Sequence, residues 1–199
     1  MSELPTRRRQ RADARRSRAA VLDAAIELLG RRPDASMDDI ATAAGTARQT
    51  VYAHYPSRHA LISAVVDRLT GETVATLAGI DADAGTATDA LRAWLEQSWR
   101  LIHRYPILLT PAIAAAGGDE YERHVPITDT LLRILNRGRR HGEFDTAQPV
   151  HWYASAIIAL GHAAGREVAT GRMSATSAGT AFVEAALRVS TDAPALPRR

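Results

Sequence analysis

The stretch that decides the fold is residues 44–61, "AGTARQTVYAHYPSRHAL". A glycine at its start and Pro56 near its end leave room for one helix of two or three turns. Between them, Val51 is surrounded by arginine, glutamine, threonine, histidine and two tyrosines. A helix this short and this polar buries little of its own surface. Its outward face therefore needs a polar partner outside the domain.

The residues just before it predict a second helix joined by a tight turn. In "ASMDDIATAAG" (35–45), Ser36 with Asp39 forms a capping-box pattern, and Gly45 is placed to end the helix. Thr46 with Gln49 repeats the capping signature and predicts the start of the next helix. Two helices joined by a glycine turn, the second short and polar, predict a helix-turn-helix whose second helix enters the major groove of DNA.

A helical wheel centred on Val51 assigns roles to the side chains of this helix. It turns Val51, Tyr55 and Ala47 inward and the remaining residues outward or to the flanks. Arginine can fork onto guanine and glutamine onto adenine, while hydroxyl and imidazole groups suit phosphates. The alternative is a surface helical hairpin without a ligand. The predicted DNA-contacting residues are Arg18, Ser36, Thr46, Ala47, Arg48, Gln49, Thr50, Tyr52, His54, Tyr55, Ser57 and Arg58.

Positive charge gathers at the N-terminus of this 199-residue chain. Residues 1–18 hold seven arginines against Glu3 and Asp13, and the chain contains no lysine. GC-rich codon usage accounts for arginine over lysine, but not for the clustering, which is typical of a surface that meets a polyanion. We expect residues 1–14 to be a disordered basic arm that approaches DNA; the alternative is a solvated tail.

Apolar residues recur at helical spacing along the remaining chain. Ser57 is placed to cap a fourth helix, and Pro106 to open another after the helix over 90–105. With no cysteine, disulfides and cysteine-ligated metals are excluded, and no apolar run approaches the ~18 residues of a membrane span. The predicted later helices cover about 120–140, 150–170 and 175–190, after loops at 79–89, 117–118 and 141–149.

Residues 37–62, "MDDIATAAGTARQTVYAHYPSRHALI", resemble the DNA-binding module of the tetracycline-repressor (TetR) family of bacterial regulators. The resemblance covers about residues 18–66. Tyr55 stands where the family usually has phenylalanine, and Thr46 where it often has a branched apolar residue. Arg48 and Gln49 fall where the family varies its base contacts. The matching positions are Ile40-Ala41, Ala44-Gly45, Thr50-Val51-Tyr52, His54-Tyr55, Ser57-Arg58 and Leu61.

The resemblance implies a cytoplasmic homodimer that binds operator DNA and releases it when a small molecule binds. It implies an all-α fold: a three-helix DNA-binding domain over 15–68, a ligand-binding and dimerisation domain over 69–190, and a flexible tail over 191–199. Because catalytic motifs and metal-ligand spacing are absent, we expect no enzymatic activity, cofactor or metal.

Two groups of residues in the second half are candidates for the ligand and the dimer. Trp94, Ser98 and Ile102 share one helical face that Tyr105 extends, and with Tyr121, Trp152 and His162 they form the predicted pocket. Trp99 lies off this face and is expected at the surface or in a dimer contact. The small residues of "WYASAIIALGHAAG" (152–165) favour close helix packing. The predicted dimer residues are Ala156, Ala159, Ala163, Phe182 and Ala186; plain core packing is the alternative for both groups.

The competing hypothesis is a helical enzyme or ligand carrier with an incidental helical hairpin. "GGDEY" (117–121) is similar to the GGDEF signature of diguanylate cyclases, but that motif needs a β-hairpin, so we interpret Asp119 as a helix cap. No hydrolase, zinc-protease or nucleotide-loop motif is present. Histidines 103, 124, 151 and 162 lack the spacing of metal ligands. Salt-sensitive binding to duplex DNA would separate the two hypotheses.

Overall fold

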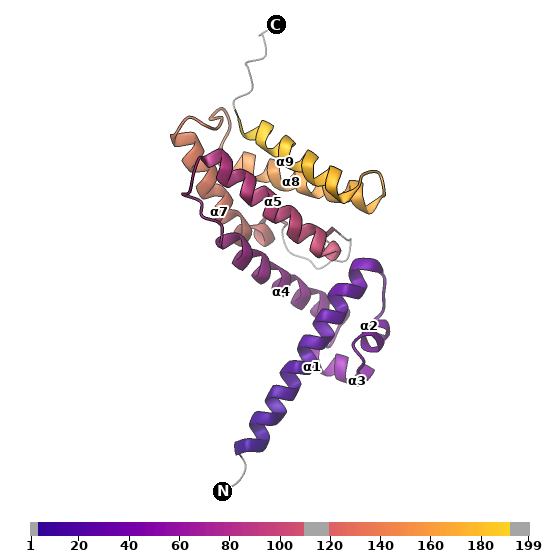
Figure 1. The fold of residues 1–199 in the computed structure, drawn as a ribbon. Helices are drawn as coiled ribbons and strands as arrows, with labels where there is room; N and C mark the ends of the chain where they lie inside the picture. The colour runs from indigo at the N-terminus through magenta and orange to yellow at the C-terminus, as the bar shows by residue number, and fades with distance from the viewer. Residues whose placement is uncertain (1–3, 110–119, 192–199) are drawn as a thin grey trace. The chain divides into compact units, whose positions relative to one another are not determined.

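The computed structural model describes residues 4–109 and 120–191, and within these ranges the regular structure is entirely helical (Figure 1). This confirms the predicted all-α class. None of the helices in these ranges is both long enough and apolar enough to cross a membrane. The elements are α1 (Leu4–Arg31), α2 (Met37–Ala43), α3 (Arg48–His54), α4 (Arg58–Ala78), α5 (Ala87–Arg104), the 3₁₀ turn η1 (Pro106–Leu109), α7 (Glu120–Arg140), α8 (Val150–Ala169) and α9 (Ala175–Ser190).

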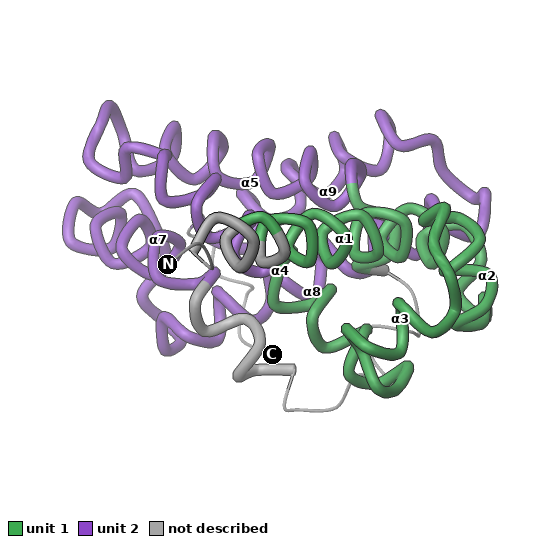
Figure 2. Tube along the Cα trace, turned by 90° about the horizontal axis from the view of Figure 1, so that it is seen from below, with its two compact units in different colours: residues 1–69, 105–117 green, residues 70–104, 118–199 purple. Residues whose placement is uncertain are grey.

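The chain divides into two compact units (Figure 2). Unit 1 comprises Met1–Leu69 with Tyr105–Gly117, and unit 2 comprises Thr70–Arg104 with Gly118–Arg199. The sequence predicted instead one continuous second domain over 69–190. Pro106 begins the short η1 rather than a full helix. Ile107 on η1 is fully buried in the core of unit 1, which explains why this segment groups with the N-terminal helices.

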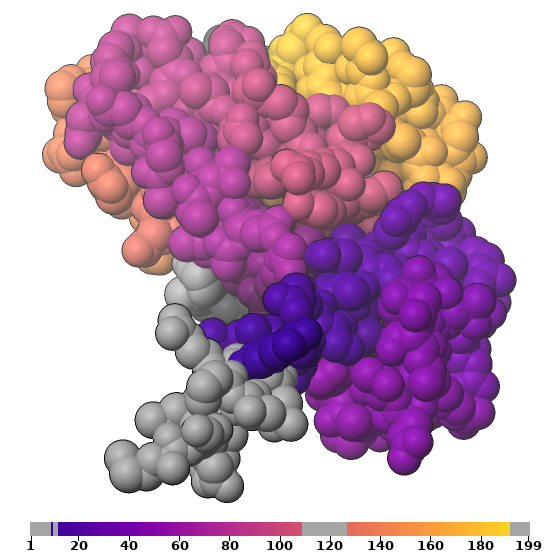
Figure 3. All heavy atoms as spheres, turned by 60° about the horizontal axis from the view of Figure 1, so that its bottom comes forward, coloured from indigo at the N-terminus to yellow at the C-terminus, as the bar shows by residue number. Residues whose placement is uncertain are grey.

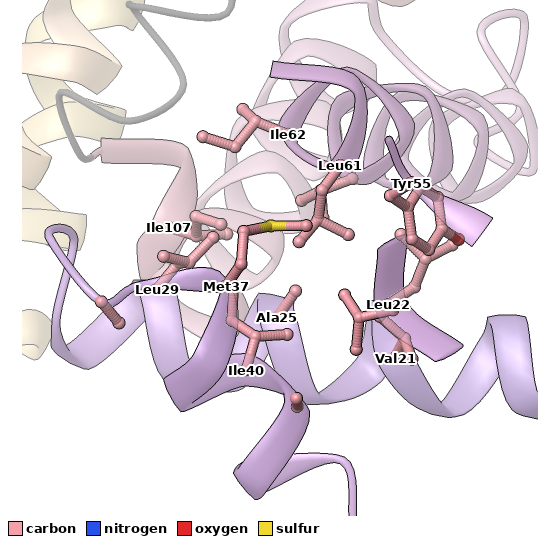
Figure 4. Close-up of a cluster of buried hydrophobic side chains, with 14 of the residues drawn as sticks. Val21, Leu22, Ala25, Leu29, Met37, Ile40, Tyr55, Leu61, Ile62 and Ile107 are labelled. Atoms are coloured by element: carbon pink, nitrogen blue, oxygen red, sulfur yellow. The ribbon is translucent and has the colours of Figure 1, made fainter. Parts of the chain in front are cut away.

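The core of unit 1 joins α1 to the helix pair and to the start of α4 (Figure 4). Val21, Leu29, Ile40, Val51 and Leu61 have no exposed surface. Burying each such side chain stabilises the fold by about 1.5–3 kcal/mol relative to leaving it in water. The helical spacing of these residues therefore decides which faces of α1, α2, α3 and α4 meet.

The basic N-terminal segment is helical, contrary to the disordered arm predicted over residues 1–14. α1 begins at Leu4 and runs without interruption to Arg31. Arginine, alanine and glutamine have high helix propensity, no glycine occurs before Gly30, and Pro5 lies in the first turn where a missing N–H costs nothing. The exposed Arg16 and Asp13 form an ion pair one turn apart. Local propensity thus extends the helix beyond the core that it covers.

The ends of α2 and the start of α3 follow the sequence prediction at two points and depart from it at a third. The capping box is confirmed, because Ser36 Oγ accepts from Asp39 N at 3.2 Å and Ser36 N donates to Asp39 Oδ2 at 2.8 Å. Gly45 has φ 62°, which confirms its place in the left-handed region after α2. The predicted cap at Thr46 is wrong: Ala47 is the N-cap of α3 and has no side-chain bond.

In unit 2, α5 begins earlier than predicted because its N-terminus receives two caps. Thr86 and Asp89 form a capping box, with Asp89 N donating to Thr86 Oγ1 at 3.0 Å. Glu143, from the loop after α7, accepts from the backbone N of Ala87 and of Thr88 at 2.9 Å each. These N–H groups hold the pKa of the Glu143 carboxyl below its usual value, the Ala87 bond having the largest effect. The helix therefore starts at Ala87 rather than at residue 90.

A buried arginine of α7 joins that helix to the connection between α4 and α5. Arg137 is 8% exposed, and its guanidinium donates to the carbonyls of Ala82, Ala84 and Gly85. The bond from Nη2 to Gly85 O measures 2.5 Å, and that to Ala84 O 3.3 Å. Three backbone acceptors of the α4–α5 connection are thus satisfied by one side chain of α7.

The contact between α5 and α9 involves three residues that the sequence analysis placed at a surface or an interface. Trp99 is half-buried: its Nε1 donates to Ala175 O at 3.1 Å, and its ring lies 6.2 Å from that of Phe182. Phe182 is 3% exposed and Ala186 is fully buried within unit 2. Both were predicted at the dimer interface. Because their side chains are already enclosed by their own chain, they present no surface to a second copy.

Gly179 gives this contact its first test. A Cβ at Gly179 would lie 2.3 Å from Trp99 Nε1, so Gly179→Ala is expected to displace the indole and lower the free energy of unfolding by roughly 1–3 kcal/mol. Gly71→Ala is the matched control, since nothing lies within 4 Å of its added Cβ. The control is expected to raise stability, because alanine is the better helix former. Equal thermal stability of the two variants would contradict the tight Trp99 contact.

Candidate nucleic-acid interface

The second helix of the pair, α3, separates an inner from an outer face. Val51 is fully buried and Tyr55, the residue after the helix, is 2% exposed. Gln49 is exposed and Tyr52 is 37% exposed. In the space-filling view, α2 and α3 lie in the violet and purple part of unit 1 (Figure 3). Ala47, predicted to point inward, is exposed, because it precedes the helix as its N-cap in an extended conformation.

Tyr55 supports the helix from inside and does not present its ring for a DNA contact. Its hydroxyl accepts from Arg18 Nε at 3.2 Å and lies 3.4 Å from Arg18 O. The Arg18 guanidinium lies 5.4 Å from the centre of the Tyr55 ring, within the range of a cation–π contact. The predicted direct DNA contact for Tyr55 is therefore wrong. Burial makes this side chain an anchor between α1 and the end of α3.

Arg48 stands at the first position of α3 with its side chain held at two places. Its Nη1 donates to Asp38 Oδ2 at 2.7 Å, and its guanidinium carbon lies 5.3 Å from the centre of the Tyr52 ring. The Arg48 side chain is nevertheless 64% exposed. Asp38 was not among the residues predicted from the sequence. No local pattern predicts that a carboxylate in the first turn of α2 will bind a residue ten positions later, on the other side of the turn.

The residues predicted to contact phosphates differ in their exposure and in their hydrogen bonds within the chain. Ser57 is exposed, and its Oγ accepts from Ala60 N at 3.1 Å, which confirms its capping of α4. Thr50 and His54 are half-buried, with His54 Nε2 lying 3.2 Å from Ser17 Oγ. Ser17, which orients the histidine, was missed because α1 gave no motif at that position.

Two other predicted contacts are occupied within unit 1. The half-buried Arg58 donates to Pro33 O at 2.6 Å and to Ala35 O, and so ties the start of α4 to the loop before α2. The hydroxyl of Ser36 belongs to the capping box. Thr46 is half-buried, with its backbone N donating to Ala41 O at 3.0 Å. We therefore assign Arg58 and Ser36 to positioning the helix pair.

The candidate effector residues in unit 2 centre on Trp94. Its side chain is 3% exposed, and within the described ranges its Nε1 is buried and has no hydrogen-bond partner. Ser98, one turn on, donates its hydroxyl to Trp94 O at 2.8 Å. Ile102 is half-buried, and its Cδ1 lies 3.7 Å from the position of a Cβ at Gly161, which places it against α8. A buried donor without a hydrogen-bond partner is uncommon in a native protein, and an acceptor on a bound ligand could satisfy it.

The other predicted effector residues do not gather at this point. Trp152 is 52% exposed, with its ring packed edge-on against Tyr153 at 5.2 Å, so its predicted place in a pocket stays a prediction. Tyr105 lies beyond the end of α5 and belongs to unit 1. His162 is half-buried. The Tyr121 side chain lies outside the described residues, as do Gly117, Gly118 and the predicted cap Asp119.

The predicted dimer residues on α8 occupy the side opposite its core face. Tyr153, Ile157 and Gly161 are buried against the neighbouring helices. Ala159 is exposed, and Ala156 and Ala163 are half-buried. A stripe of small side chains thus remains accessible on α8 after unit 2 has formed its own core.

Comparisons with known proteins agree with this arrangement. A family model described as "Bacterial regulatory proteins, tetR family" matches residues 21–65, which span the helix pair. The transcriptional repressor LfrR of Mycolicibacterium smegmatis is 34% identical over 131 residues, 61% of this chain and 65% of LfrR, so the alignment spans just under two thirds of that repressor. An uncharacterised regulator, YvdT of Bacillus subtilis, is 27% identical over 70% of this chain and 76% of its own length.

Solved structures extend the likeness over most of the chain. LfrR from Mycobacterium smegmatis in complex with proflavine superimposes with a TM-score of 0.68 at 28% identity, covering 90% of this chain and 99% of LfrR. A TetR-family regulator from Agrobacterium tumefaciens has a TM-score of 0.73 at 18% identity, covering 90% of this chain and all of that one, which shows the common fold alone. From the matched helix pair, its caps and these relatives together, the chain belongs to the tetR family of bacterial regulatory proteins.

Proposed function

We propose that this protein is a transcriptional repressor that binds operator DNA through α3 and is released by a small-molecule effector. The observation that carries the proposal is the division of α3 into two faces. Val51 and Tyr55 hold the inner side in the core, while Arg48, Gln49 and Tyr52 remain exposed on the other. Arginine and glutamine near the start of a recognition helix are suited to guanine and adenine edges in the major groove.

The proposal includes a homodimer formed through the exposed face of α8. Its support is the stripe of Ala156, Ala159 and Ala163 that the core of unit 2 leaves accessible. Small side chains allow two helices to approach closely. A two-fold dimer would place two copies of α3 on half-sites about 34–36 Å apart, one turn of the double helix. Such a regulator would act in the cytoplasm, where the operator is.

The effector is proposed to be a planar aromatic molecule that binds in unit 2 near Trp94. Two observations support this class. The indole N–H of Trp94 is buried without a partner in the described part of the chain, and the relative LfrR was solved in complex with proflavine, a flat three-ring compound. The effector can release DNA only to the extent that it binds the DNA-free conformation more tightly.

The experiment selects duplexes from a random pool with the whole protein and then tests Arg48→Ala on the selected site. Loss of a bidentate base contact is expected to weaken binding by roughly 1–3 kcal/mol on that site and to leave affinity for random duplex nearly unchanged. Arg140→Ala, which removes the same charge from an exposed position of α7, is the control and should bind as wild type does. Equal losses on selected and random DNA would contradict base reading by Arg48.

A further inference from the structure

We propose that Asp38 determines base selectivity by holding Arg48 in the orientation that reads a base pair. The inference rests on the proposed DNA binding and adds to it a positioning residue on α2 that does not itself touch DNA. Asp38 Oδ2 accepts from Arg48 Nη1 at 2.7 Å, and the two side chains are 55% and 64% exposed. They therefore meet at the outer surface of the helix pair, on the side where α3 begins.

Two contacts together limit the conformations open to the Arg48 side chain. The carboxylate of Asp38 binds one end of the guanidinium. The guanidinium carbon lies over the ring of Tyr52, one turn along α3, at 5.3 Å from the ring centre. The carboxylate is itself well placed, because α2 is anchored by the capping box at Ser36 and Asp39. A carboxylate, a guanidinium and an aromatic ring thus lie together along the exposed edge.

The hydrogen-bond inventory of arginine leaves the base-reading function open. A guanidinium has five N–H donors, and Asp38 uses one through Nη1. The Nε and Nη2 donors remain for the O6 and N7 acceptors of guanine, which need two donors side by side. A side chain that is already oriented loses less rotamer freedom when it binds. An exposed ion pair adds little to folding stability, so its value here lies in orientation.

The negative charge of Asp38 also acts against the wrong partner. A free arginine on this surface could turn to the nearest phosphate, which would strengthen binding to any sequence. A carboxylate beside the guanidinium repels phosphates and makes that alternative less favourable. The neighbouring Asp39 has another role, because its carboxylate accepts from Ser36 and lies 3.2 Å from Arg32. Of these two adjacent carboxylates, Asp38 is therefore the one that orients a side chain of the recognition helix.

The test compares Asp38→Asn with wild type on a panel of duplexes derived from the selected site, each carrying one exchanged base pair. The base pair that Arg48 reads is the one at which Arg48→Ala loses discrimination. At that pair, Asp38→Asn is expected to reduce discrimination roughly tenfold, while discrimination at the other pairs stays unchanged. Affinity for random duplex should stay equal or rise. Adding Asp38→Asn to Arg48→Ala should cause no further loss of discrimination.

The controls separate orientation from charge and from folding. Asp34→Asn removes the same charge from an exposed position of the same unit and should leave the whole panel unchanged. Tyr52→Phe keeps the ring and should keep the wild-type ratio of affinities between matched and exchanged base pairs, even if loss of the hydroxyl lowers every affinity alike. Tyr52→Ala should lose discrimination at the same base pair as Asp38→Asn. Circular dichroism checks that each variant is as helical as wild type.

Each other outcome has a definite meaning. If Asp38→Asn shifts every duplex by a common factor, Asp38 acts only through its charge, and the inference is overturned. An unchanged panel overturns it as well. If wild type selects no duplex from the pool, the proposed function itself fails. If wild type is selective and Asp38→Asn discriminates between the duplexes as wild type does, only the proposed role of Asp38 fails.

Discussion

Arg137→Ala is expected to lower the free energy of unfolding by about 3 kcal/mol, measured by denaturant titration. The guanidinium is 8% exposed and donates to the carbonyls of Ala82, Ala84 and Gly85. Alanine leaves these acceptors of the α4–α5 connection without their donor and leaves space where the side chain was. The positive charge also helps to keep the pKa of Glu143 low, so the cap on α5 is weakened at the same time.

Arg140→Ala provides the control for this result. It lies three positions further along α7, at its exposed end, and its removal is expected to change stability by less than about 0.5 kcal/mol. Arg137→Lys should recover part of the loss, because an ammonium can reach one carbonyl but cannot bind three. If Arg137→Ala were as stable as Arg140→Ala, the carbonyl contacts of Arg137 would contribute nothing to unit 2.

Replacing Arg7, Arg8, Arg9 and Arg11 together by alanine is expected to weaken DNA binding by roughly 10²–10³-fold near physiological salt. Removing the arginine from one phosphate should reduce the slope of log K against log salt by about 0.9. Alanine preserves the helical propensity of α1, so the fold and the stability of unit 1 should not change. Titrations at several salt concentrations give both quantities from one set of measurements.

A matched variant tests whether position matters or only total charge. Alanine at four exposed arginines of unit 2 (92, 100, 140 and 188) removes the same charge from elsewhere in the chain. This variant is expected to change the salt slope much less than the α1 variant. If the slope of log K against log salt fell equally in the two variants, the arginines of α1 would act only through the total charge of the chain. If the slope of the α1 variant equalled that of wild type, these arginines would make no contact with DNA phosphates.

The sequence by itself determined the helix pair, because its signals are local. Ser36 with Asp39, Gly45 and Pro56 each act through the backbone of their own turn, and a residue a few positions away is always within reach. The same is true of Val51, whose place on the inner face follows from a period of 3.6 residues. The residue types at matching positions of the same stretch carried the family resemblance, which the comparisons confirm.

Local sequence signals failed where they were compatible with more than one structure. Thr46 offered a cap, but the chain begins α3 after Ala47. Residues 4–14 had the charge expected of a disordered arm, yet their propensity continues α1. The sequence offered Trp99, Trp152 and Phe182 as interface or pocket residues without saying which surface of each helix a neighbour would cover. The structure packs the half-buried Trp99 against α9 and leaves Trp152 exposed.

Only the tertiary structure decided the contacts that join distant segments. Arg137 meets carbonyls more than fifty positions earlier, Glu143 caps a helix that begins at Ala87, and Asp38 reaches Arg48 across the turn. No spacing rule relates such pairs, since each depends on how separately formed helices pack. The sequence thus determined which helices form and which face of each is apolar, because those properties reside in consecutive residues. Packing decided which polar side chains remain free for a ligand, because a donor is free only when no other segment of the folded chain satisfies it.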